Sequence, residues 1–333
     1  MHVFAPGRIN LIGDHTDYTG GFVLPMAIDL GTTIRGERGG DRIELRSDAC
    51  EGVADMPIAM SDPASAVPEW TRYVAGVVAE LQPRHGFVGE ITSTLPLGAG
   101  LSSSASLELA VALAVGDERD PLRLALLCQR AEHCGAGVPC GIMDQLVVAA
   151  AIEDHALLID CSSLEWRPVR IPDDVAIYAV HCGEERRLIG SAYADRRADC
   201  VAAESVAGPL RDADIDRVER LADERIRRRA RHVVSENDRV HWFATAIERG
   251  DYVRAGALMT ESHRSLRDDF KVSTTGLDQL VERLCAIPGV FGARMTGAGF
   301  GGCAVVLAVP GVEVDGWRLR PTAAARVSGD ALG

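Results

Sequence analysis

The sequence predicts a protein of mixed α and β structure that is divided into two domains. With 333 residues, of which 47% are hydrophobic and 25% charged, the chain can bury one large core or two ordinary ones, and two is the more usual arrangement. Strand-like and helix-like patterns alternate to about residue 171, and a new apolar strand, VAIYAVHC, follows Pro172. We therefore expect one domain over residues 1–172 and a second over residues 173–333.

The first domain is predicted to have strands and helices in layers, in an α/β or α+β arrangement. The segments IELRS and GEITSTL have the composition of strands, and residues 101–115 are apolar enough for a buried helix. A further helix is expected to begin at Asp120 and Pro121, a capping residue followed by a proline at the first helical position. It should run to about His133 and end at the glycine-rich loop CGAGVPCG.

The second domain shows helical patterns followed by a strand. Residues 212–231 are highly charged and predict one amphipathic surface helix with apolar positions at Ile215, Val218, Leu221 and Ile226. Its basic run, RIRRRARH, lies among acidic residues and so indicates a solvated helix face rather than a phosphate or nucleic-acid site. Further helices are expected at VHWFATAIERG and VRAGALMTESHRSL, and a buried strand at CAVVLAV.

Charge and composition exclude several kinds of partner. The formal net charge of −13 lacks the basic surface that nucleic acids and anionic membranes require. The runs ASLELAVALAV and QLVVAAAI are shorter than the roughly 20 residues that span a bilayer. The nine cysteines have no paired spacing, and the first residues, MHVFAPGRIN, do not resemble a signal peptide. We expect a cytoplasmic protein with reduced thiols and no obligate protein partner.

The segment PLGAGLSSSASLELA has the features of a phosphate-binding loop. A strand-like ITSTL leads into a glycine-rich turn and then a helix, so that unpaired backbone N–H groups gather at a helix N-terminus. Gly98 and Gly100 would let the backbone approach phosphates, and Ser102, Ser103 and Ser104 would add hydroxyl groups or a magnesium ligand. A capped helix after a tight turn is the alternative, although one cap needs only one side-chain oxygen.

Better-known nucleotide-binding motifs do not fit this segment. No lysine follows the glycines where the Walker loop requires one, and the dinucleotide fingerprint is also missing. The catalytic-loop and metal-binding patterns of protein kinases do not occur either. A nucleotide would therefore be held chiefly by backbone and hydroxyl groups.

Three further segments could carry chemistry. APGRINLIGDHTDYTGG gathers Arg8, Asp14, His15 and Asp17, whose polar groups suit a polyol, although a polar surface turn is the alternative. Asp144 begins an apolar helix, as either a structural cap or a group that acts on a phosphoryl acceptor. Glu132 has the local context of a surface residue. The glycine-dense ARMTGAGFGGCAVVL predicts a tight turn before a buried strand.

Taken together, these segments resemble the galactokinases. GRINLIGDHTDYTGGFVLPMAIDL resembles their signature, PLGAGLSSSASLELA their nucleotide-binding segment, and MTGAGFGGC their third, glycine-rich segment. The order is that of the family, and the resemblance extends from about Ala5 to Leu307. It implies the α+β small-molecule kinase fold of the galactokinase, homoserine kinase, mevalonate kinase and phosphomevalonate kinase superfamily. In that fold an active site lies between an N-terminal ribosomal-protein-like domain and a C-terminal ferredoxin-like domain.

The resemblance also implies an activity, which is Mg²⁺-dependent transfer of phosphate from ATP to the anomeric hydroxyl of galactose or a galactose-like sugar. Asp144 matches the catalytic aspartate and Arg8 the arginine beside it, which would keep Asp144 ionised as a base or an orienting group. The magnesium ligands match Ser104 and Glu132. The sugar-contacting positions match Asp14, His15, Asp17, Gly141 and Tyr193. The nucleotide-binding positions match Trp70, Gly98, Gly100, Leu101, Ser102, Ser103 and Ser104.

Departures from the family pattern leave the identity of the sugar open. Asp14 stands where galactokinases usually have glutamate, so its carboxylate reaches about 1.5 Å less far. An arginine of the family is replaced by Glu185, and after Leu307 the C-terminal domain is expected to be abbreviated. We therefore expect a sugar altered or extended at carbon 6, unless a small backbone shift restores the ordinary contact. A phosphate on such an extension would meet Arg186, Arg187 or Arg196.

Other functions on the same fold are also conceivable. The enzyme alternatives are kinases for an N-acetylated or uronic sugar, or for an elongated heptose- or octose-type sugar of secondary metabolism. A non-catalytic sugar sensor is less favoured, because the GLSSSAS segment is intact and Asp144 is present.

Overall fold

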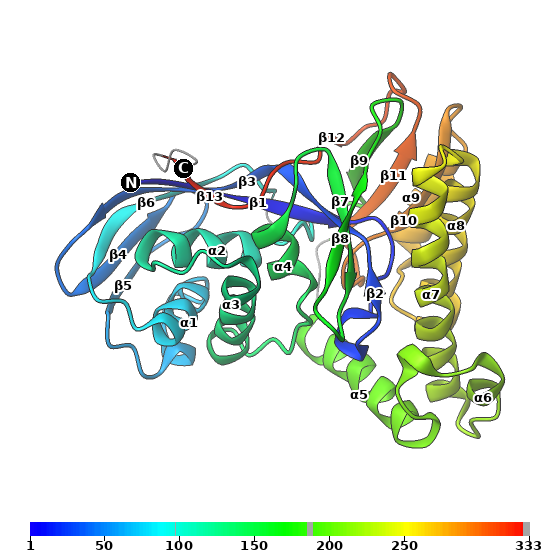
Figure 1. Cartoon of the computed structure of the whole chain (residues 1–333), viewed down its shortest axis with the longest axis horizontal. Coiled ribbons are helices and arrows are strands. Elements are labelled where there is room, and N and C mark those ends of the chain that lie inside the picture. Colours follow the sequence, from blue (N-terminus) through cyan, green and yellow to red (C-terminus); the bar gives the residue numbers. More distant parts are fainter. Residues whose placement is uncertain (97, 185–188, 329–333) are drawn as a thin grey trace.

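Strands at the two ends of the chain build one sheet, and a second sheet lies at the opposite end of an elongated molecule (Figure 1). The computed structural model describes residues 1–96, 98–184 and 189–328. In this part of the chain the strands form sheets of six, four and three. The mixed α and β content agrees with the fold class that the sequence predicts.

The first sheet has the strand order β13-β1-β3-β6-β4-β5, and only the β4–β6 pair is parallel. Its strands are β1 (His2–Asn10), β3 (Pro25–Arg38), β4 (Arg42–Ser47), β5 (Val53–Pro57), β6 (Phe87–Ser93) and β13 (Arg326–Ser328). One face is covered by α1 (Thr71–Leu81), α2 (Ser103–Val115), α3 (Pro121–Gly135) and α4 (Met143–Ala150) (Figure 1). The strands expected at IELRS and GEITSTL are β4 and β6.

α2 and α3 lie close to the helices that the sequence predicts at residues 101–115 and from Asp120 to about His133. Asp120 caps α3, because its side chain accepts a hydrogen bond from Arg123 N at 2.9 Å, and Pro121 takes the first helical position. α2 is apolar on nearly all sides because it lies between the sheet and the other helices. Its one fully buried acid, Glu108, is the exception to this pattern.

The second half is built around the sheet β10-β11-β9-β12, which is antiparallel throughout. Its strands are β9 (Ala176–His181), β10 (Val290–Met295), β11 (Cys303–Ala308) and β12 (Trp317–Leu319), and β11 is the strand expected at CAVVLAV. α7 (Glu224–Glu248), α8 (Tyr252–Ser265) and α9 (Thr275–Cys285) lie beside it, while α5 (Ile189–Ala207) and α6 (Ile215–Glu219) project from one end (Figure 1). A smaller sheet, of β2 (Phe22–Val23), β7 (His155–Asp160) and β8 (Trp166–Arg170), lies between the halves.

The prediction of one helix over residues 212–231 is wrong. The chain instead forms a 3₁₀ turn (Leu210–Asp212), the short α6, and then α7, which begins at Glu224. Asp223 explains the break, because its side chain accepts hydrogen bonds from Arg225 N at 2.8 Å and Ile226 N at 3.4 Å. This N-cap starts a new helix in place of continuing the old one.

The basic run at the start of α7 is neutralised by acidic side chains. Arg228 pairs with Glu224 at 3.0 Å, and Arg229 with Asp199 at 3.4 Å. Arg231 contacts Glu219 and Asp269. These pairs leave the run without the unopposed positive charge that a phosphate or nucleic-acid site needs.

The two halves share more than a connecting segment. β13 pairs with β1, with Val327 opposite Val3, so the end of the described chain lies in the first sheet. Ile9 and Leu24 from the first half pack into one core with Phe243 and Val305 from the second. The division at residues 172 and 173 stays a prediction. Among the residues that the structure describes, no helix is both long and apolar enough to cross a membrane.

We predict that Asp223→Ala frays the first turn of α7, because Arg225 N and Ile226 N lose their capping oxygen. Loss of an N-cap costs about 1 kcal/mol, so amide exchange in this turn should be roughly fivefold faster. Hydrogen exchange read by mass spectrometry measures this directly. Asp238→Ala, at an exposed position within the same helix, is the control, and equal exchange in both variants would contradict the assigned cap.

Candidate active site

A cavity of about 130 Å³ lies between the two halves of the molecule. Its walls come from β1 and the loop after it, from the start of α4, from α5, and from the glycine-rich loop after β10. It is lined by Arg8, Asp14, His15, Asp17, Glu132, Val138, Cys140, Gly141, Met143, Asp144, Tyr193, Gly297 and Ala298. Every residue that the sequence assigns to sugar contact therefore meets Asp144 and Arg8 in one place.

Asp144 is held at the cavity by a two-point pairing with Arg8. Arg8 donates from Nε to Oδ1 at 2.7 Å and from Nη2 to Oδ2 at 2.6 Å. Its third nitrogen, Nη1, donates to the Gly100 carbonyl at 2.7 Å. Arg8 is almost fully buried, whereas the Asp144 side chain keeps 24% of its surface exposed toward the cavity. A carboxylate fixed in this way can accept a hydrogen bond from a bound hydroxyl group.

The glycine- and serine-rich loop divides its groups between two sites. Gly98 and Gly100 have φ of +71° and +78°, which L side chains rarely adopt, and Leu101 is buried with its carbonyl bound by Arg8 N. The Ser102 hydroxyl donates to Asp144 Oδ2 and so connects this loop to the first cavity. Ser103 and Ser104 face a second cavity.

The second cavity has a volume of about 150 Å³ and a mostly apolar lining. Trp70, which the resemblance places near the nucleotide, lies in its wall, and its Nε1 donates to the Glu51 carbonyl at 2.9 Å, which fixes the indole plane. Tyr73, Cys50 and Leu107 line the same cavity and were not predicted from the sequence. A flat apolar cavity with hydroxyl groups at its edge suits a nucleotide base, with its phosphates at Ser103 and Ser104.

Glu132 belongs to a buried polar cluster rather than to the surface. Its Oε2 accepts from Gln145 Nε2 at 2.6 Å and from the Cys140 thiol at 3.3 Å. Burial, and then the charge of Asp144, raise the pKa of Glu132 to about 7, while the Ser104 side chain lowers it. Ser104 and Glu132, the predicted magnesium ligands, are thus neighbours. The local sequence of α3 had favoured the wrong environment for Glu132.

Two members of this cluster carry no sequence signal of function. Gln145 Nε2 donates a second hydrogen bond to Glu108 Oε2 at 3.1 Å, and both side chains are fully buried. Burial and the neighbouring Glu132 raise the pKa of Glu108 well above its ordinary value. Glutamate within an apolar helix was the only visible sign, and by itself it does not separate a site from a core position.

His15 is neutral, and both of its ring nitrogens are occupied. Burial lowers the pKa of His15 to about 3. Nε2 lies 3.2 Å from the Ala298 carbonyl and therefore donates to it, which leaves Nδ1 to accept from the Tyr18 hydroxyl at 2.9 Å. The ring lines the cavity, so His15 shapes the wall, while both of its nitrogens form hydrogen bonds within the protein.

Asp17 and Gly141 depend on each other's size. A Cβ atom at position 141 would lie 1.9 Å from Asp17 Oδ2, so only glycine leaves room for the carboxylate. Burial, followed by the charge of Asp144, raises the pKa of Asp17 to about 7. A bound sugar hydroxyl that donates a hydrogen bond to the Asp17 carboxylate would favour its ionised form and so offset the effect of burial.

α5 places Tyr193 at the cavity and also forms a hydrogen bond to the loop at the cavity's edge. The Tyr193 ring lies 5.7 Å from that of His15 and 5.4 Å from that of Tyr18. Arg197 donates to the Pro139 carbonyl at 2.5 Å, next to the loop that carries Gly141. Arg196 donates to the carbonyls of Phe270 and Lys271 and does not line the cavity. Glu185, Arg186 and Arg187 lie outside the described residues.

Comparison with protein families matches three segments of the chain. Residues 1–38 match the galactokinase galactose-binding signature, residues 72–151 the N-terminal domain of GHMP kinases, and residues 243–327 the C-terminal domain of GHMP kinases. The human galactokinase is 44% identical over 326 residues, which cover 92% of this chain and 83% of the human protein.

Solved structures give the same relationship. A galactokinase from Lactococcus lactis in complex with galactose has a TM-score of 0.90 and 31% identity, and the match covers 98% of this chain and 94% of that one. Mevalonate kinase from Methanococcus jannaschii has a TM-score of 0.71 at 20% identity, over 97% of this chain and 98% of that one, which shows a shared fold.

We predict that Asp17→Asn stabilises the ligand-free protein clearly more at pH 8 than at pH 5, and least below pH 4. The folded protein holds the Asp17 proton to about pH 7, whereas the ordinary pKa is 3.8. The contribution of this group is therefore complete below the ordinary pKa and is lost as the pH rises through about 7. Asparagine does not ionise, so the variant avoids this loss of stability at high pH.

Thermal unfolding midpoints at both pH values test this prediction. Asp173→Asn, at an exposed position, serves as the control and should shift neither midpoint. An Asp17→Asn midpoint that moves equally at pH 5 and pH 8 would show that Asp17 does not bind its proton more tightly in the folded state.

Proposed function

Because this chain belongs to the galactokinases of the GHMP kinase superfamily, we propose that it phosphorylates the anomeric hydroxyl of galactose at the expense of ATP. It is an ATP-dependent sugar kinase by its family. The observation that carries the proposal is the position of Asp144 between the two cavities. Asp144 lines the first cavity, and the loop that binds it through Ser102 continues into Ser103 and Ser104 at the second.

In the proposed reaction, the chain mainly positions the reactants and balances charge, as phosphoryl transfer requires. Asp144 accepts the hydrogen bond of the anomeric hydroxyl, either as the base that takes its proton or as the group that orients it. Arg8 fixes both carboxylate oxygens, so the acceptor direction is set before the sugar binds. Backbone and hydroxyl groups of residues 98–104 hold the phosphates.

We assign Mg²⁺ to Ser104 and Glu132, which offer the hard oxygen ligands that this ion prefers. Glu132 is buried beside other carboxylates, with Asp144 and Glu108 close enough to affect the pKa values of this cluster, so a cation has a clear electrostatic place there. Within the described residues, no group of three or more His, Cys, Asp or Glu side chains could hold a metal alone. This suits an ion that takes its remaining ligands from water and phosphate, and neutralises phosphate charge when bound.

Galactose fits the first cavity better than a much larger sugar does. Its volume of about 130 Å³ is below the roughly 300–1,000 Å³ of sites for drug-sized ligands. A sugar altered or extended at carbon 6 stays a prediction from Asp14. We also propose a cytoplasmic location, because the spacing of the nine cysteines does not resemble a disulfide framework.

A coupled ATPase assay over a sugar panel tests the proposed function. The panel contains galactose, 6-substituted galactoses, and N-acetylated, uronic and longer-chain sugars, and NMR locates the phosphate on the product. We expect galactose to be turned over efficiently with phosphate on carbon 1, and Asp14→Glu to report on the far end of the sugar. Phosphate on another carbon, or no turnover of any sugar, would overturn the proposal.

We predict that Asp144→Ala lowers kcat about a hundredfold or more, the usual effect of removing a positioned acid–base group. ATP binding should change little, because Asp144 does not line the second cavity. Steady-state kinetics and ATP titration measure the two effects. Asp144→Asn, which keeps the size of the side chain, controls for packing, and near-normal turnover in either variant would refute the catalytic role.

We predict that Ser104→Ala and Glu132→Gln each raise the Mg²⁺ concentration needed for half-maximal activity. Ser104→Ala removes a hydroxyl ligand, and Glu132→Gln replaces a charged carboxylate oxygen by a neutral amide oxygen, so each variant should weaken Mg²⁺ binding. Activity is titrated with Mg²⁺ at saturating ATP, and Mn²⁺ binding is followed by electron paramagnetic resonance. Ser205→Ala, at an exposed position on α5, is the control. Unchanged titrations in both variants would place the metal elsewhere.

A further inference from the structure

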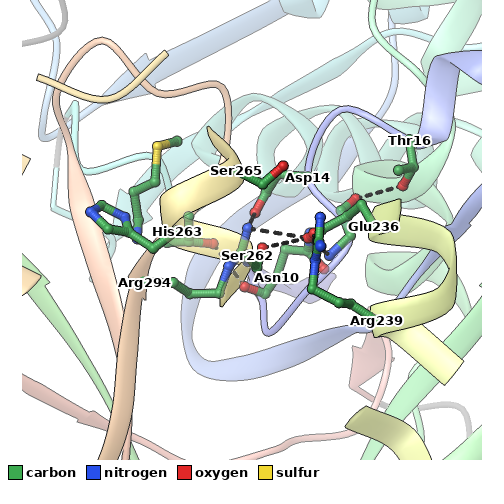
Figure 2. A network of polar contacts seen from close by, with 12 residues as sticks. Asn10, Asp14, Thr16, Glu236, Arg239, Ser262, His263, Ser265 and Arg294 are labelled. Atoms are coloured by element: carbon green, nitrogen blue, oxygen red, sulfur yellow. Dashed lines mark hydrogen bonds and ion pairs between the residues drawn. The ribbon is translucent and has the colours of Figure 1, made fainter. Parts of the chain in front are cut away.

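Arg294 is a fully buried arginine directly behind the sugar cavity. It lies in β10, and Figure 2 shows its side chain extending toward Asp14 and Glu236. Nη2 is 2.6 Å from Asp14 Oδ2 and 3.8 Å from Glu236 Oε1, while Nη1 donates to the Leu11 carbonyl at 3.2 Å. The sequence context of Arg294, ARMTGAGFGGCAVVL, indicates only a tight turn before a buried strand.

Asp14 is held by several groups from the second half of the chain, in addition to the side chain of Asn10 from its own half. Arg294 contacts one carboxylate oxygen, and Gly297 N donates to the other at 2.9 Å. His232 Nε2 donates to the Asp14 carbonyl at 3.0 Å. The carboxylate is only 2% exposed, and it lines the cavity where a sugar would bind. Its position therefore depends largely on β10, the loop after it and α7, and not on its own segment alone.

The charges around this contact are balanced in pairs. Glu236 accepts from Arg239 Nε at 2.7 Å, from Ser262 Oγ at 2.5 Å and from Gly13 N at 3.0 Å (Figure 2). Glu236 thus has its own cation in Arg239, which leaves Arg294 for Asp14. Burial raises the pKa of Asp14 and Arg294 lowers it, so Arg294 favours the ionised carboxylate.

We propose that Arg294 is a positioning residue that sets how far the Asp14 carboxylate reaches into the sugar cavity, and thereby which sugars the enzyme accepts. This inference rests on the proposed function. Oδ2 is drawn to Arg294, so Asp14 meets a sugar hydroxyl through Oδ1, which Gly297 N already orients. A carboxylate restrained at both oxygens tolerates little change in the hydroxyl that it contacts.

The planar guanidinium is essential to this role, because it reaches Leu11 O, Asp14 Oδ2 and Glu236 Oε1 from one fixed fork. Lysine carries the same charge at a single nitrogen and cannot span these three acceptors. Arg294→Lys therefore keeps charge balance and removes the geometry. This separates positioning from simple neutralisation of the buried acids.

The test compares Arg294→Lys, Asp14→Asn and the double variant. We expect Arg294→Lys to raise the KM for galactose about tenfold, the scale of one weakened hydrogen bond to a charged group. The KM for ATP and kcat should stay within about threefold. A set of deoxygalactoses, each lacking one hydroxyl group, locates the effect. In Arg294→Lys the preference for galactose over the deoxy sugar should weaken for only one of these hydroxyl groups, the one that Asp14 contacts. Because Arg294 acts through Asp14, Arg294→Lys should add nothing in the Asp14→Asn background.

Arg239→Lys is the matched control, since Arg239 belongs to the same buried network but pairs with Glu236 and not with Asp14. It should lower the thermal midpoint without changing the KM for galactose. Three results would overturn the proposal. They are an unchanged galactose KM in Arg294→Lys, an equal rise in Arg239→Lys, or effects that multiply in the double variant.

The remaining outcomes are also decisive. If Arg294→Lys does not fold, Asp14→Asn is compared with Asp14→Asn/Arg294→Gln, where equal galactose KM values support the proposal and unequal values refute it. If the wild-type enzyme phosphorylates galactose but the variants do not behave as expected, only the positioning role of Arg294 is refuted, and the proposed function stands. A wild-type enzyme with no galactose turnover overturns the proposed function, and the same variants are then compared on the sugar that is turned over.

Discussion

The ion pair between Arg8 and Asp144 is the contact on which the site depends, because it connects three elements that are far apart in the chain. Arg8 comes from β1, Asp144 from α4, and the glycine- and serine-rich loop contributes the Gly100 carbonyl and the Ser102 hydroxyl. Each group is satisfied only when all three elements are in place. The sugar cavity and the nucleotide cavity are thereby fixed relative to each other, which is the condition for transferring a phosphoryl group between them.

Excess negative charge is the second constraint. Glu132 and Glu108 are buried and Asp17 is partly buried around the site, and loss of hydration raises the pKa of each. An apolar interior stabilises such groups only if they are protonated, paired or bound to a cation. Arg294 and Arg8 pair with Asp14 and Asp144. Glu132 instead lies beside Ser104, where we expect the metal ion and the phosphates to bind. This arrangement therefore lowers the stability of the ligand-free protein, and binding of a sugar, ATP and a metal ion would offset that cost.

The second half of the chain does more than cover the site. Gly297, Arg294 and His232 come from it, and all three hold Asp14. Ala298 fixes the ring of His15, and α5 carries Tyr193. A signature segment at the N-terminus thus acquires its shape from residues more than two hundred positions away. Local features of the signature show which chemical groups are available, but not where they point.

The sequence by itself determined the kind of molecule, because glycine turns, helix caps and apolar patterns act over a few residues. These predicted a mixed α and β protein, the helices α2 and α3, and a phosphate-binding loop, while the resemblance to galactokinases implied the α+β fold and the sugar-contacting positions. Only the tertiary structure decided how Ser102 and Ser104 divide between Asp144 and the nucleotide side, and that Glu132 is buried. It also decided that Arg294 pairs with Asp14 and that β13 joins β1. Such contacts join distant segments through packing and charge, and no local pattern records them.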